Sequence, residues 1–566
     1  MIYLGIHNSY QAGAALIIDG QVIGAVTEER FNRVKNYHGW PTESISYLLD
    51  LARISLSDVD KVVYGMVTET YPDAKSSKKL IERMLEDEPG NDYIKARYTD
   101  RILSESRWNQ KHLEELFTWS ANNNLDEKIS FVDHHVSHAA GAFFTSPFDK
   151  AVVFTCDGKG NYKSSSVSIG AGSELKEIEF QTTYDSVGYY YGIITKALGY
   201  KSERHEGKVT GLAALGDPGK FTHITDKMLE FKDGKIRTNI GKFFIPWFAS
   251  EEDLPFLYNE VKKHKKEDVA AAAQDTLERV IVKWIDFNLR KLGKEKKRVC
   301  LSGGVFANVK LNQKIRELDI VDDVYVQPAM GDMGIPLGSC LMQMSLEGNT
   351  SFDFVDSMDL GPAFRIEEIL KEAETGKVTC KKVPDIREAV AQLLDSDKVI
   401  GFCHGRMEYG PRALCNRSII FHARDKSVND WLNKRLNRTE FMPFAPVTTL
   451  EIAGKCFEGW NEDQVSADFM TMTYNVTDDF AEKCPAAVHV DNTARPQVIR
   501  EHINEKMHSI ISHYNKTRGD LALVNTSFNN HEEPIVCNAR DALDSLYRNN
   551  VDVLVVEDYV IEIVKS

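Results

Sequence analysis

The sequence predicts an α/β protein whose first part is internally duplicated and whose last part is a separate α/β region. The first observation is a run of three short apolar strands at the start of the chain, the last two joined by a turn signal. The second is the return of this pattern about 150 residues later. The third is that helical periodicity follows each set of strands. Two such units at this spacing indicate a duplicated core.

The first set of strands is expected over Ile2–His7, Ala12–Ile18 and Gln21–Thr27. Asp19-Gly20 stands between the last two runs and supplies the residue types that adopt the positive φ angles of a tight hairpin turn. A helical pattern then covers Glu43–Ala52. The chain therefore begins with a strand, a hairpin and a helix.

The second set of strands is expected over Ala151–Cys156, Ser164–Ile169 and Glu174–Phe180. Gly170-Ala171-Gly172 separates the last two runs, and the long helical pattern Asp268–Leu292 follows. A further strand is expected at Val299–Ser302. Repetition of the hairpin-plus-helix unit is typical of the actin-like ATP-binding superfold.

A domain boundary is expected within Gly348–Pro362, where helical periodicity stops and Gly, Asn, Thr, Ser and acidic residues are mixed. A new α/β pattern starts near Phe364, with a helix at Arg387–Leu394 and a strand at Val399–Cys403. The predicted organisation is a domain over residues 1–350, a linker over 351–365 and a second domain over 366–566.

The composition excludes disordered, collagen-like and coiled-coil proteins, since 42% of the residues are hydrophobic and 27% are charged. The 69 Lys and Arg residues against 84 Asp and Glu residues give a formal charge of −15. This balance argues against a protein that holds nucleic acid or anionic membrane through its overall field.

The nine cysteines are scattered and include no C-x-x-C pair, which predicts reduced thiols and neither a disulfide framework nor a zinc site. The segment Met1–His7 has no basic region before its apolar residues, and no apolar stretch reaches about 18 residues. We therefore expect a cytoplasmic protein without a membrane span.

The densest chemical signal is the histidine-rich segment 131–140. If His134 opens a helix, His138 lies one turn further on the same face, which is the spacing that two imidazoles need to share a metal. Asp157 ends a predicted buried strand, and Asp332 stands between glycines. Two His with two Asp suit Fe(II), Mn(II) or Zn(II). The alternatives are a capping histidine cluster and aspartates that cap turns or helices.

Two segments rich in small residues are candidates for nucleotide contact. Gly303 and Gly304 follow a strand and precede a helical pattern that contains Asn308, so their amides could face a sugar or phosphate. Lys208 lies in the second segment, 207–214, and offers a cation to an anionic group. A tight strand-to-helix turn and close helix packing are the alternatives.

Three arginines, Arg406, Arg412 and Arg417, lie within twelve residues among Gly and Pro. The guanidinium is a planar fork of donors that matches phosphate or carboxylate, so a loop of this kind can direct several forks at one anion. The polar run Asn525–Asn529 follows a predicted strand. An Asx or ST turn is the alternative for this run.

Together these segments resemble the O-carbamoyltransferase family of the nodulation-factor and antibiotic-tailoring type. The matching segments occur in one order, at residues 28–33, 134–140, 157–158, 207–214, 303–305 with Asn308, 332–338, 405–418, 443–446, 494–497 and 525–529. The resemblance implies a duplicated actin-like module (ASKHA, threonylcarbamoyltransferase-like) followed by a smaller YrdC-like α/β module.

The resemblance also implies an ATP-dependent reaction in two steps. The second module would make carbamoyl-adenylate from carbamoyl phosphate and ATP, with magnesium accompanying the ATP, and would release phosphate and pyrophosphate. The first module would transfer the carbamoyl group to a hydroxyl of a small-molecule or glycosylated acceptor, and AMP would leave. Iron(II), or another divalent metal, is the implied ion of the first module.

The roles of single residues follow from their places in the family pattern. The metal set would be His134, His138, Asp157 and Asp332, with His138 also catalytic. The catalytic arginines that neutralise the transferring phosphates would be Arg406, Arg412 and Arg417. The cofactor-binding residues would be Lys208, Gly303, Gly304, Asn308, Arg438, Arg495, Asn525 and Ser527.

The sequence departs from the family pattern in places. Many members carry His-Asp where this chain has Tyr10-Gln11-Ala12-Gly13, so the acceptor and its catalytic base stay open. Cys415 stands where Gly is usual, which we expect to affect local packing. Lys434, Arg435 and Arg438 compete for one phosphate-facing role, with Arg438 favoured.

Two other enzyme classes are alternatives. A sugar kinase on the actin-like core would yield ADP, whereas the implied reaction yields AMP and pyrophosphate, and a kinase would leave the arginine segment unexplained. A transfer-RNA-modifying transferase conflicts with the charge of −15. A scaffold with vestigial sites would not need full metal and arginine sets. The sequence leaves a homodimer open.

Overall fold

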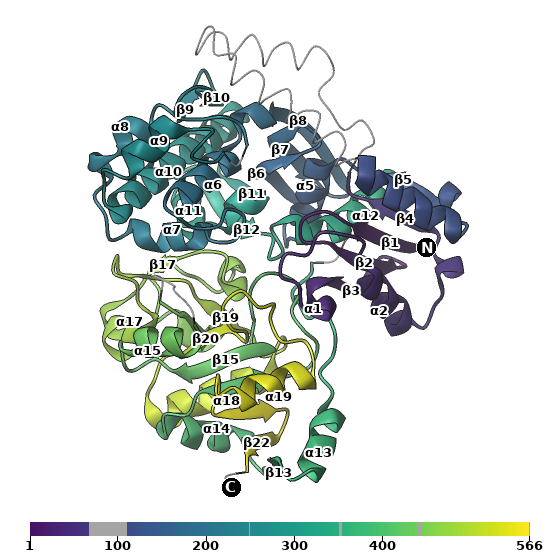
Figure 1. Ribbon diagram of the computed structural model, residues 1–566, viewed down its shortest axis with the longest axis vertical. Helices are drawn as coiled ribbons and strands as arrows, with labels where there is room; N and C mark the ends of the chain where they lie inside the picture. The colour runs from purple at the N-terminus through teal and green to yellow at the C-terminus, as the bar shows by residue number, and fades with distance from the viewer. Residues whose placement is uncertain (67–109, 248, 350–351, 353, 438–442, 565–566) are drawn as a thin grey trace. The chain divides into compact units, whose positions relative to one another are not determined.

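The computed structural model describes residues 1–66, 110–247, 249–349, 352, 354–437 and 443–564 (Figure 1). The chain divides into two compact units. The first unit comprises Met1–Tyr10, Ala15–Gln21 and Arg53–Phe354. The second unit comprises Gln11–Ala14, Val22–Ala52 and Val355–Ser566.

The first sheet has five strands in the order β3-β2-β1-β4-β5. Its strands are β1 (Ile2–His7), β2 (Gly13–Ile18), β3 (Gln21–Thr27), β4 (Lys61–Tyr64) and β5 (Ile129–Phe131). β4 runs parallel to both β1 and β5. Asp19 and Gly20 have φ angles of 49° and 87°, as a tight turn between β2 and β3 requires. The hairpin predicted from the sequence is confirmed.

The second sheet repeats this order as β8-β7-β6-β11-β12. Its strands are β6 (Lys150–Gly160), β7 (Lys163–Ala171), β8 (Glu174–Thr182), β11 (Lys297–Ser302) and β12 (Val321–Val326). β6 to β8 form an antiparallel meander, while β11 runs parallel to both β6 and β12. The predicted duplication of an actin-like α/β unit is therefore present in the topology.

Helices α5 (His134–Phe144) and α12 (Ile335–Leu346) lie between these sheets in the chain's first unit (Figure 1). They approach closely because glycines face each other: a Cβ on Gly338 would lie 2.0 Å from the Ser137 carbonyl oxygen and 3.0 Å from the Gly141 amide nitrogen. Since α12 begins just after Asp332, this contact holds two distant chain segments in one place.

Six helices of the first unit gather on the side of the second sheet near β9 (Leu229–Lys232) and β10 (Lys235–Thr238) (Figure 1). They are α6 (Val187–Ala197), α7 (Glu206–Ala213), α8 (Thr222–Thr225), α9 (Pro255–Val261), α10 (Lys266–Lys291) and α11 (Val309–Arg316). The predicted helix at 268–292 corresponds to α10, whose buried face includes Trp284 packed edge-on against Phe154 of β6.

The second unit contains an eight-stranded sheet in the order β13-β22-β21-β14-β15-β20-β16-β19. Its strands are β13 (Val378–Lys382), β14 (Ile400–Cys403), β15 (Arg417–His422), β16 (Ala445–Thr449), β19 (Gln497–Ile499), β20 (Leu523–Ser527), β21 (Val553–Val556) and β22 (Tyr559–Ile563). β17 (Tyr474–Asn475) and β18 (Thr493–Ala494) pair separately. This is the α/β region expected from the sequence, and its likeness to YrdC remains a prediction.

The helices of the second unit come from both ends of the chain. They are α1 (Glu29–Asn32), α2 (Thr42–Ala52), α13 (Ile366–Glu374), α14 (Ile386–Asp395), α15 (Val428–Arg435), α16 (Leu450–Ala453), α17 (Asp478–Lys483), α18 (Glu505–Arg518) and α19 (Ala539–Tyr547). The N-terminal segment joins through hydrogen bonds to backbone carbonyls: the Ala25 N–H donates to the Leu360 carbonyl, and the Arg33 guanidinium donates to the Pro534 and Ile535 carbonyls. The sequence did not predict this grouping.

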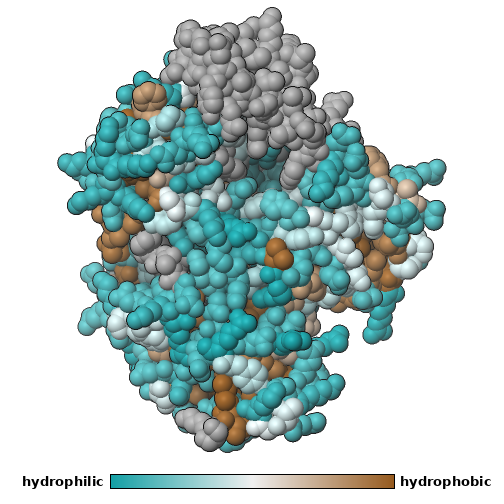
Figure 2. Space-filling model, viewed as in Figure 1, coloured by the Kyte–Doolittle hydropathy of each residue, from teal (hydrophilic) through white to brown (hydrophobic). Residues whose placement is uncertain are grey.

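The mostly hydrophilic surface and the free cysteines are typical of a globular protein. Figure 2 shows a face on which hydrophilic residues predominate and apolar residues lie in separate small groups. All nine cysteines are free, as the sequence predicts. Among the helices of the described part of the chain, none combines the length and the apolar character that crossing a membrane requires.

Candidate functional site

Helix α5 places two histidines on one face. Asp133 caps the helix by accepting a hydrogen bond from the Val136 N–H, so the helix starts at His134 and puts His138 one turn later. The two ring centroids are 4.8 Å apart, and both side chains are almost fully buried. The predicted spacing of the histidines is therefore present on one helix face.

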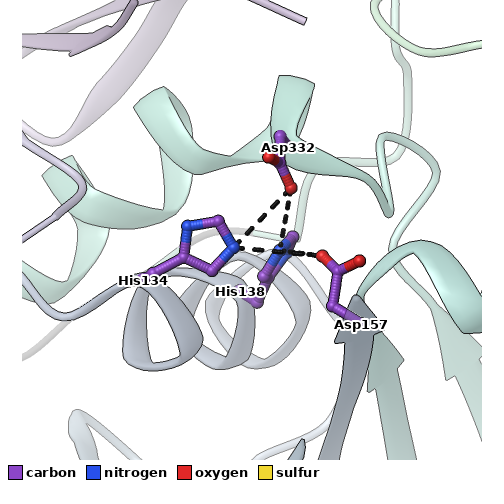
Figure 3. A group of neighbouring side chains, drawn as sticks. All are labelled: His134, His138, Asp157 and Asp332. Carbon is purple, nitrogen blue, oxygen red and sulfur yellow. Dashed lines mark hydrogen bonds and ion pairs between the residues drawn. The ribbon is translucent and has the colours of Figure 1, made fainter. Parts of the chain in front are cut away.

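Two aspartates meet these histidines from other elements (Figure 3). Asp157 projects from β6, and Asp332 precedes α12. Nε2 of His138 lies 3.2 Å from Asp157 Oδ2 and 3.6 Å from Asp332 Oδ1, and Nε2 of His134 lies 3.9 Å and 3.6 Å from the same oxygens. The four donor atoms all lie within 4.8 Å of one another.

Glycines shape the backbone around Asp157. Gly303 has a φ angle of 100°, and a Cβ there would lie 2.3 Å from the Cys156 carbonyl oxygen, so this turn accepts no larger residue without movement. A Cβ on Gly188 would likewise lie 2.5 Å from the Gly158 amide nitrogen. The close approach of both glycines fixes the strand end that carries the carboxylate.

The cluster is held together by its charges. Burial opposes the charged form of His138, but its contacts with Asp157 and Asp332 raise its pKa to about 9. Burial likewise opposes ionisation of the two aspartates, yet the histidines hold their pKa values below the ordinary range. Both carboxylates are therefore ionised at neutral pH and can face a cation.

A hydroxyl orients His138 from the opposite side. Nδ1 of His138 lies 3.2 Å from Ser302 Oγ, and Ser302 Oγ donates to the Met330 carbonyl 3.3 Å away. If Oγ donates to that carbonyl, it can accept from Nδ1–H. The proton on Nε2 faces the carboxylates while the ring is charged, and a metal ion that displaced this proton would meet the lone pair of Nε2. The sequence motif containing Ser302 was apparent, but this role was not predicted.

The cluster fits a divalent metal ion. Both ring nitrogens of His134 are buried without a hydrogen-bond partner, although Nε2 faces two carboxylates. Such an orphaned imidazole is costly unless an unseen group completes it. Two imidazoles and two carboxylates form a donor set for Fe(II), Mn(II) or Zn(II). The structure thus brings the four predicted residues together, and their role as ligands stays a prediction.

The predicted nucleotide residues of the first unit occupy separate positions. Gly304 lies next to the cluster, since a Cβ there would be 3.1 Å from Asp157 Oδ1. Asn308 caps α11 by accepting from the Leu311 N–H, and its amide also bonds to Gln274. Lys208 lies buried in α7. These contacts are structural, and nucleotide binding by these residues remains a prediction.

In the second unit, two of the three predicted arginines bond to backbone carbonyls. Arg406 donates to the carbonyls of Leu360, Gly361 and Ile23. Arg417 is fully buried and donates to the carbonyls of Pro362, His404, Gly405 and Asn416. Their forks therefore hold the loop in place, which favours a positioning role over direct phosphate contact.

Glu408 completes the support of this loop. One of its oxygens, Oε1, accepts the N–H groups of Leu414, Asn416 and Arg417 at 2.6, 2.7 and 3.1 Å. A carboxylate that receives three amides closes the loop into a fixed turn. Arg412 lies in the chain between Glu408 and these three amides. Of the three arginines, Arg412 is the one that we still expect to bind phosphate.

Of the remaining predicted residues of the second unit, Asn525 contacts this loop, whereas Ser527 and Arg495 lie at the ends of two strands. Asn525 donates to Gln497 Oε1 at 2.7 Å and to the Ala413 carbonyl at 3.2 Å, so it contacts the arginine loop. Ser527 follows on the same strand, β20, and bonds to Asn529. Arg495 directly follows β18. Their roles stay predictions.

The choice among the three basic residues near 434–438 becomes narrower. Arg435 makes a two-pronged ion pair with Asp552 at 2.9 and 3.0 Å and bonds to the Asn549 carbonyl, so its fork is occupied by the fold. Arg438 lies outside the described residues. Lys434 lies in the last turn of α15, which ends at Arg435.

Two family models match this chain. The model described as Carbamoyltransferase N-terminus matches residues 3–341, and the one described as Carbamoyltransferase C-terminus matches residues 391–563. The chain belongs to the carbamoyltransferase family. The resemblance that the sequence motifs indicated is confirmed, and the protein is an enzyme that transfers carbamoyl groups.

Curated relatives of this carbamoyltransferase include rhizobial proteins. Nodulation protein NolNO of Sinorhizobium fredii is 33% identical over 98% of this chain and 79% of its own length. Nodulation protein U of the same species is 26% identical over 93% of each chain. Full-length HypF, solved in a phosphate- and nucleotide-bound form, has a TM-score of 0.33 at 13% identity, over 62% of this chain and 56% of its own. That likeness is too low to argue from.

One residue near the cluster of this carbamoyltransferase was not predicted from the sequence: His7, which is buried at the end of β1. Its Nε2 lies 3.7 Å from Asp332 Oδ2. A single histidine after an apolar strand gives no spacing signal, because its partner is more than 300 residues away in the chain. Such a residue becomes visible through the fold alone.

Proposed function

We propose that this carbamoyltransferase is ATP-dependent and carries out two steps. The second unit forms carbamoyl-adenylate from carbamoyl phosphate and ATP, and releases phosphate and pyrophosphate. The first unit transfers the carbamoyl group to a hydroxyl of a small-molecule or glycosylated acceptor, and AMP leaves. The observation that carries the proposal is the buried four-donor cluster inside the region that matches the N-terminal family domain.

The cluster supplies a preorganised anionic site in the first unit. Asp157 and Asp332 stay ionised beside His134 and His138, and Ser302 holds the His138 ring with Nε2 toward them. A divalent ion bound there would act as a Lewis acid toward a carbamoyl or phosphate oxygen. The chain's part is to fix these donors before the substrate arrives, so that little reorganisation is needed during transfer.

The arginine loop of the second unit supplies the charge that the adenylation step needs. Water first takes the phosphoryl group of carbamoyl phosphate, which releases phosphate and leaves carbamate. Bond formation between a carbamate oxygen and the α-phosphorus of ATP then breaks the bond to the β-phosphate and expels pyrophosphate, and negative charge accumulates on the phosphates. Arg406, Arg417 and Glu408 hold the loop, and Arg412 presents its guanidinium to the phosphates. Because the loop is held in place before the substrates bind, the Arg412 charge can stabilise the transition state with little rearrangement.

The transfer step consumes the adenylate without a net redox change. The acceptor oxygen forms a bond with the carbamoyl carbon, the bond from that carbon to the phosphate oxygen breaks, and the hydroxyl proton passes to a base. The region of Tyr10, where many family members carry His-Asp, is the part of this chain in which that base and the acceptor pocket would differ.

The nucleotide product tests the proposal against its rivals. Incubation of the full chain with ATP and carbamoyl phosphate should give AMP and pyrophosphate, whereas a sugar kinase would give ADP with a sugar alone. A transfer-RNA-modifying enzyme would bind RNA with an affinity that falls steeply with salt. ADP formation that needs no carbamoyl phosphate would reject the proposed reaction.

A further inference from the structure

His7 is a buried imidazole without a hydrogen-bond partner. Its side chain is 1% exposed, and neither Nδ1 nor Nε2 has a partner among the described residues. A buried polar group that is left unpaired loses its hydrogen bonds to water and gains none in return, which destabilises the folded state. His7 therefore lowers the stability of the fold unless it serves a function at the end of this strand.

Among the described residues, the charged neighbour of His7 within ion-pair distance is a member of the four-donor cluster. His7 Nε2 lies 3.7 Å from Oδ2 of Asp332, while Oδ1 of the same carboxylate lies 3.6 Å from Nε2 of His134 and of His138. The two oxygens of Asp332 thus have different partners. The ring centroids of His7 and His134 are 6.3 Å apart.

His7 stands outside the set of mutually close donors. The group whose donor atoms all lie within 4.8 Å of one another is His134, His138, Asp157 and Asp332. A residue that comes close to one carboxylate of the group but is not among its mutually close donors is placed to orient that carboxylate rather than to act as a ligand. This distinction separates a positioning residue from a fifth donor.

The backbone around His7 is held firmly. A Cβ on Gly5 would lie 2.0 Å from the Pro336 carbonyl oxygen, so β1 touches the first turn of the helix that follows Asp332. On the other side, Asn8 accepts from the Tyr64 hydroxyl and donates to the His112 carbonyl. The contacts of Gly5 and Asn8, which lie before and after His7 in the chain, therefore fix the position of His7 relative to Asp332.

We propose that His7 is a positioning residue of the metal site: when the site holds its ion, Nε2–H of His7 closes the 3.7 Å separation from Oδ2 of Asp332 and donates to it, which keeps Oδ1 directed at the other three donors. This inference rests on the proposed metal-binding role of the cluster. It assigns to His7 the tautomer with the proton on Nε2, and it explains why a lone imidazole is buried there.

The test compares three substitutions at position 7 in the full chain. Glutamine can place its amide nitrogen near the position of Nε2, asparagine can place one only near Nδ1, and leucine fills the space without a donor. Chelator-treated protein would be titrated with Co(II), and the affinity and the visible absorption spectrum of the bound ion recorded. His264→Leu, at a partly buried histidine of the same unit, is the control.

We expect His7→Leu and His7→Asn to weaken Co(II) binding by about 10–100-fold and to alter the spectrum. His7→Gln and His264→Leu should stay within a few-fold of the wild-type affinity. Thermal unfolding of the metal-free variants separates loss of the site from loss of the fold, and the comparison of His7→Gln with His7→Asn holds even if His7→Leu misfolds.

Two results would overturn the inference in different ways. Wild-type affinity and an unchanged spectrum in His7→Leu, or equal weakening in His7→Gln and His7→Asn, would reject the role of the Nε2 donor while leaving the metal site in place. Failure of the wild-type chain to bind Co(II) would reject the metal set itself, and the inference with it.

Discussion

Gly160 lies directly against the ring of His134: a Cβ built on this glycine would be 2.0 Å from Cδ2 and 2.6 Å from Nε2 of the imidazole. Real Cβ atoms do not approach other heavy atoms so closely, so the ring can occupy its place because residue 160 has no side chain. The end of β6 thus constrains one of the predicted metal ligands.

Gly160→Ala should therefore displace the His134 ring and weaken metal binding. We expect a loss of at least about tenfold in affinity for Co(II) or Fe(II), since one donor of four must move. The measurement is metal titration of chelator-treated protein. Gly454→Ala is the control, because a Cβ there would meet its nearest neighbour at 3.9 Å. Equal affinities in the two variants would show that the ring does not act as a donor.

Arg412 and Arg417 should respond differently to substitution by alanine. Arg412→Ala should abolish pyrophosphate release from ATP with carbamoyl phosphate and leave the unfolding temperature within a few degrees of the wild type. Arg417→Ala should instead destabilise the protein by about 3 kcal/mol or more, because several buried carbonyls lose their donor. Wild-type turnover in Arg412→Ala would remove this residue from the adenylation site.

Asp359 should make stability depend on pH. Burial, with a smaller effect of the Glu408 carboxylate, raises the pKa of Asp359 to about 7. The folded state therefore keeps a proton that the unfolded state has lost, so stability should fall as pH rises from about 4 to about 7, by up to about 1.4 kcal/mol per pH unit, and then level off.

Asp359→Asn removes this dependence, since asparagine does not titrate. The unfolding midpoint of the variant should rise relative to the wild type as pH increases from 5 to about 7 and stay constantly above it at higher pH. Asp463→Asn, at an exposed position, is the control. A variant whose advantage over the wild type does not change with pH would contradict the assignment.

Cys415 lies in a backbone conformation that favours glycine, the residue expected at this position from the family pattern. Its φ angle is 77°, in the left-handed region where a side chain costs about 1 kcal/mol or more. Cys415→Gly should therefore be at least as stable as Cys415→Ala, which loses the same sulfur contacts with Gln497 and Asn525 but keeps the strain. A clearly more stable alanine variant, measured by chemical unfolding, would contradict this account.

The sequence predicted those parts of the site that depend on local spacing. His134 and His138 share a helix face because they are four residues apart, and Asp157 ends a strand whose apolar pattern is plain. The repeated hairpin revealed the duplication of the first unit, and the hydrophobic periodicity revealed α10 and β14.

Residues that act through distant partners could not be predicted in this way. His7 meets Asp332, and Arg406 meets the Ile23 carbonyl, across more than 300 residues of chain. Arginines that bind phosphate and arginines that bind carbonyls have the same donors, so the sequence of the 405–418 loop gives no means of telling them apart. The grouping of residues 22–52 with the C-terminal unit depends on the same long-range contacts.

The central claim is that the chain transfers a carbamoyl group by way of an adenylate, with the metal cluster acting in the second step. The direct measurement follows label from carbonyl-labelled carbamoyl phosphate in the presence of ATP and hydroxylated acceptors, with AMP and pyrophosphate quantified in the same reaction. Wild-type protein and His138→Ala would be compared, with His223→Ala as the control for loss of a histidine.

The wild type and His223→Ala should form AMP, pyrophosphate and a labelled carbamate of the acceptor. His138→Ala should still release pyrophosphate but lose its metal and form the carbamate on the order of 10³-fold more slowly. Carbamate formation at the wild-type rate by metal-free His138→Ala, or its formation with ADP in place of AMP, would contradict the account.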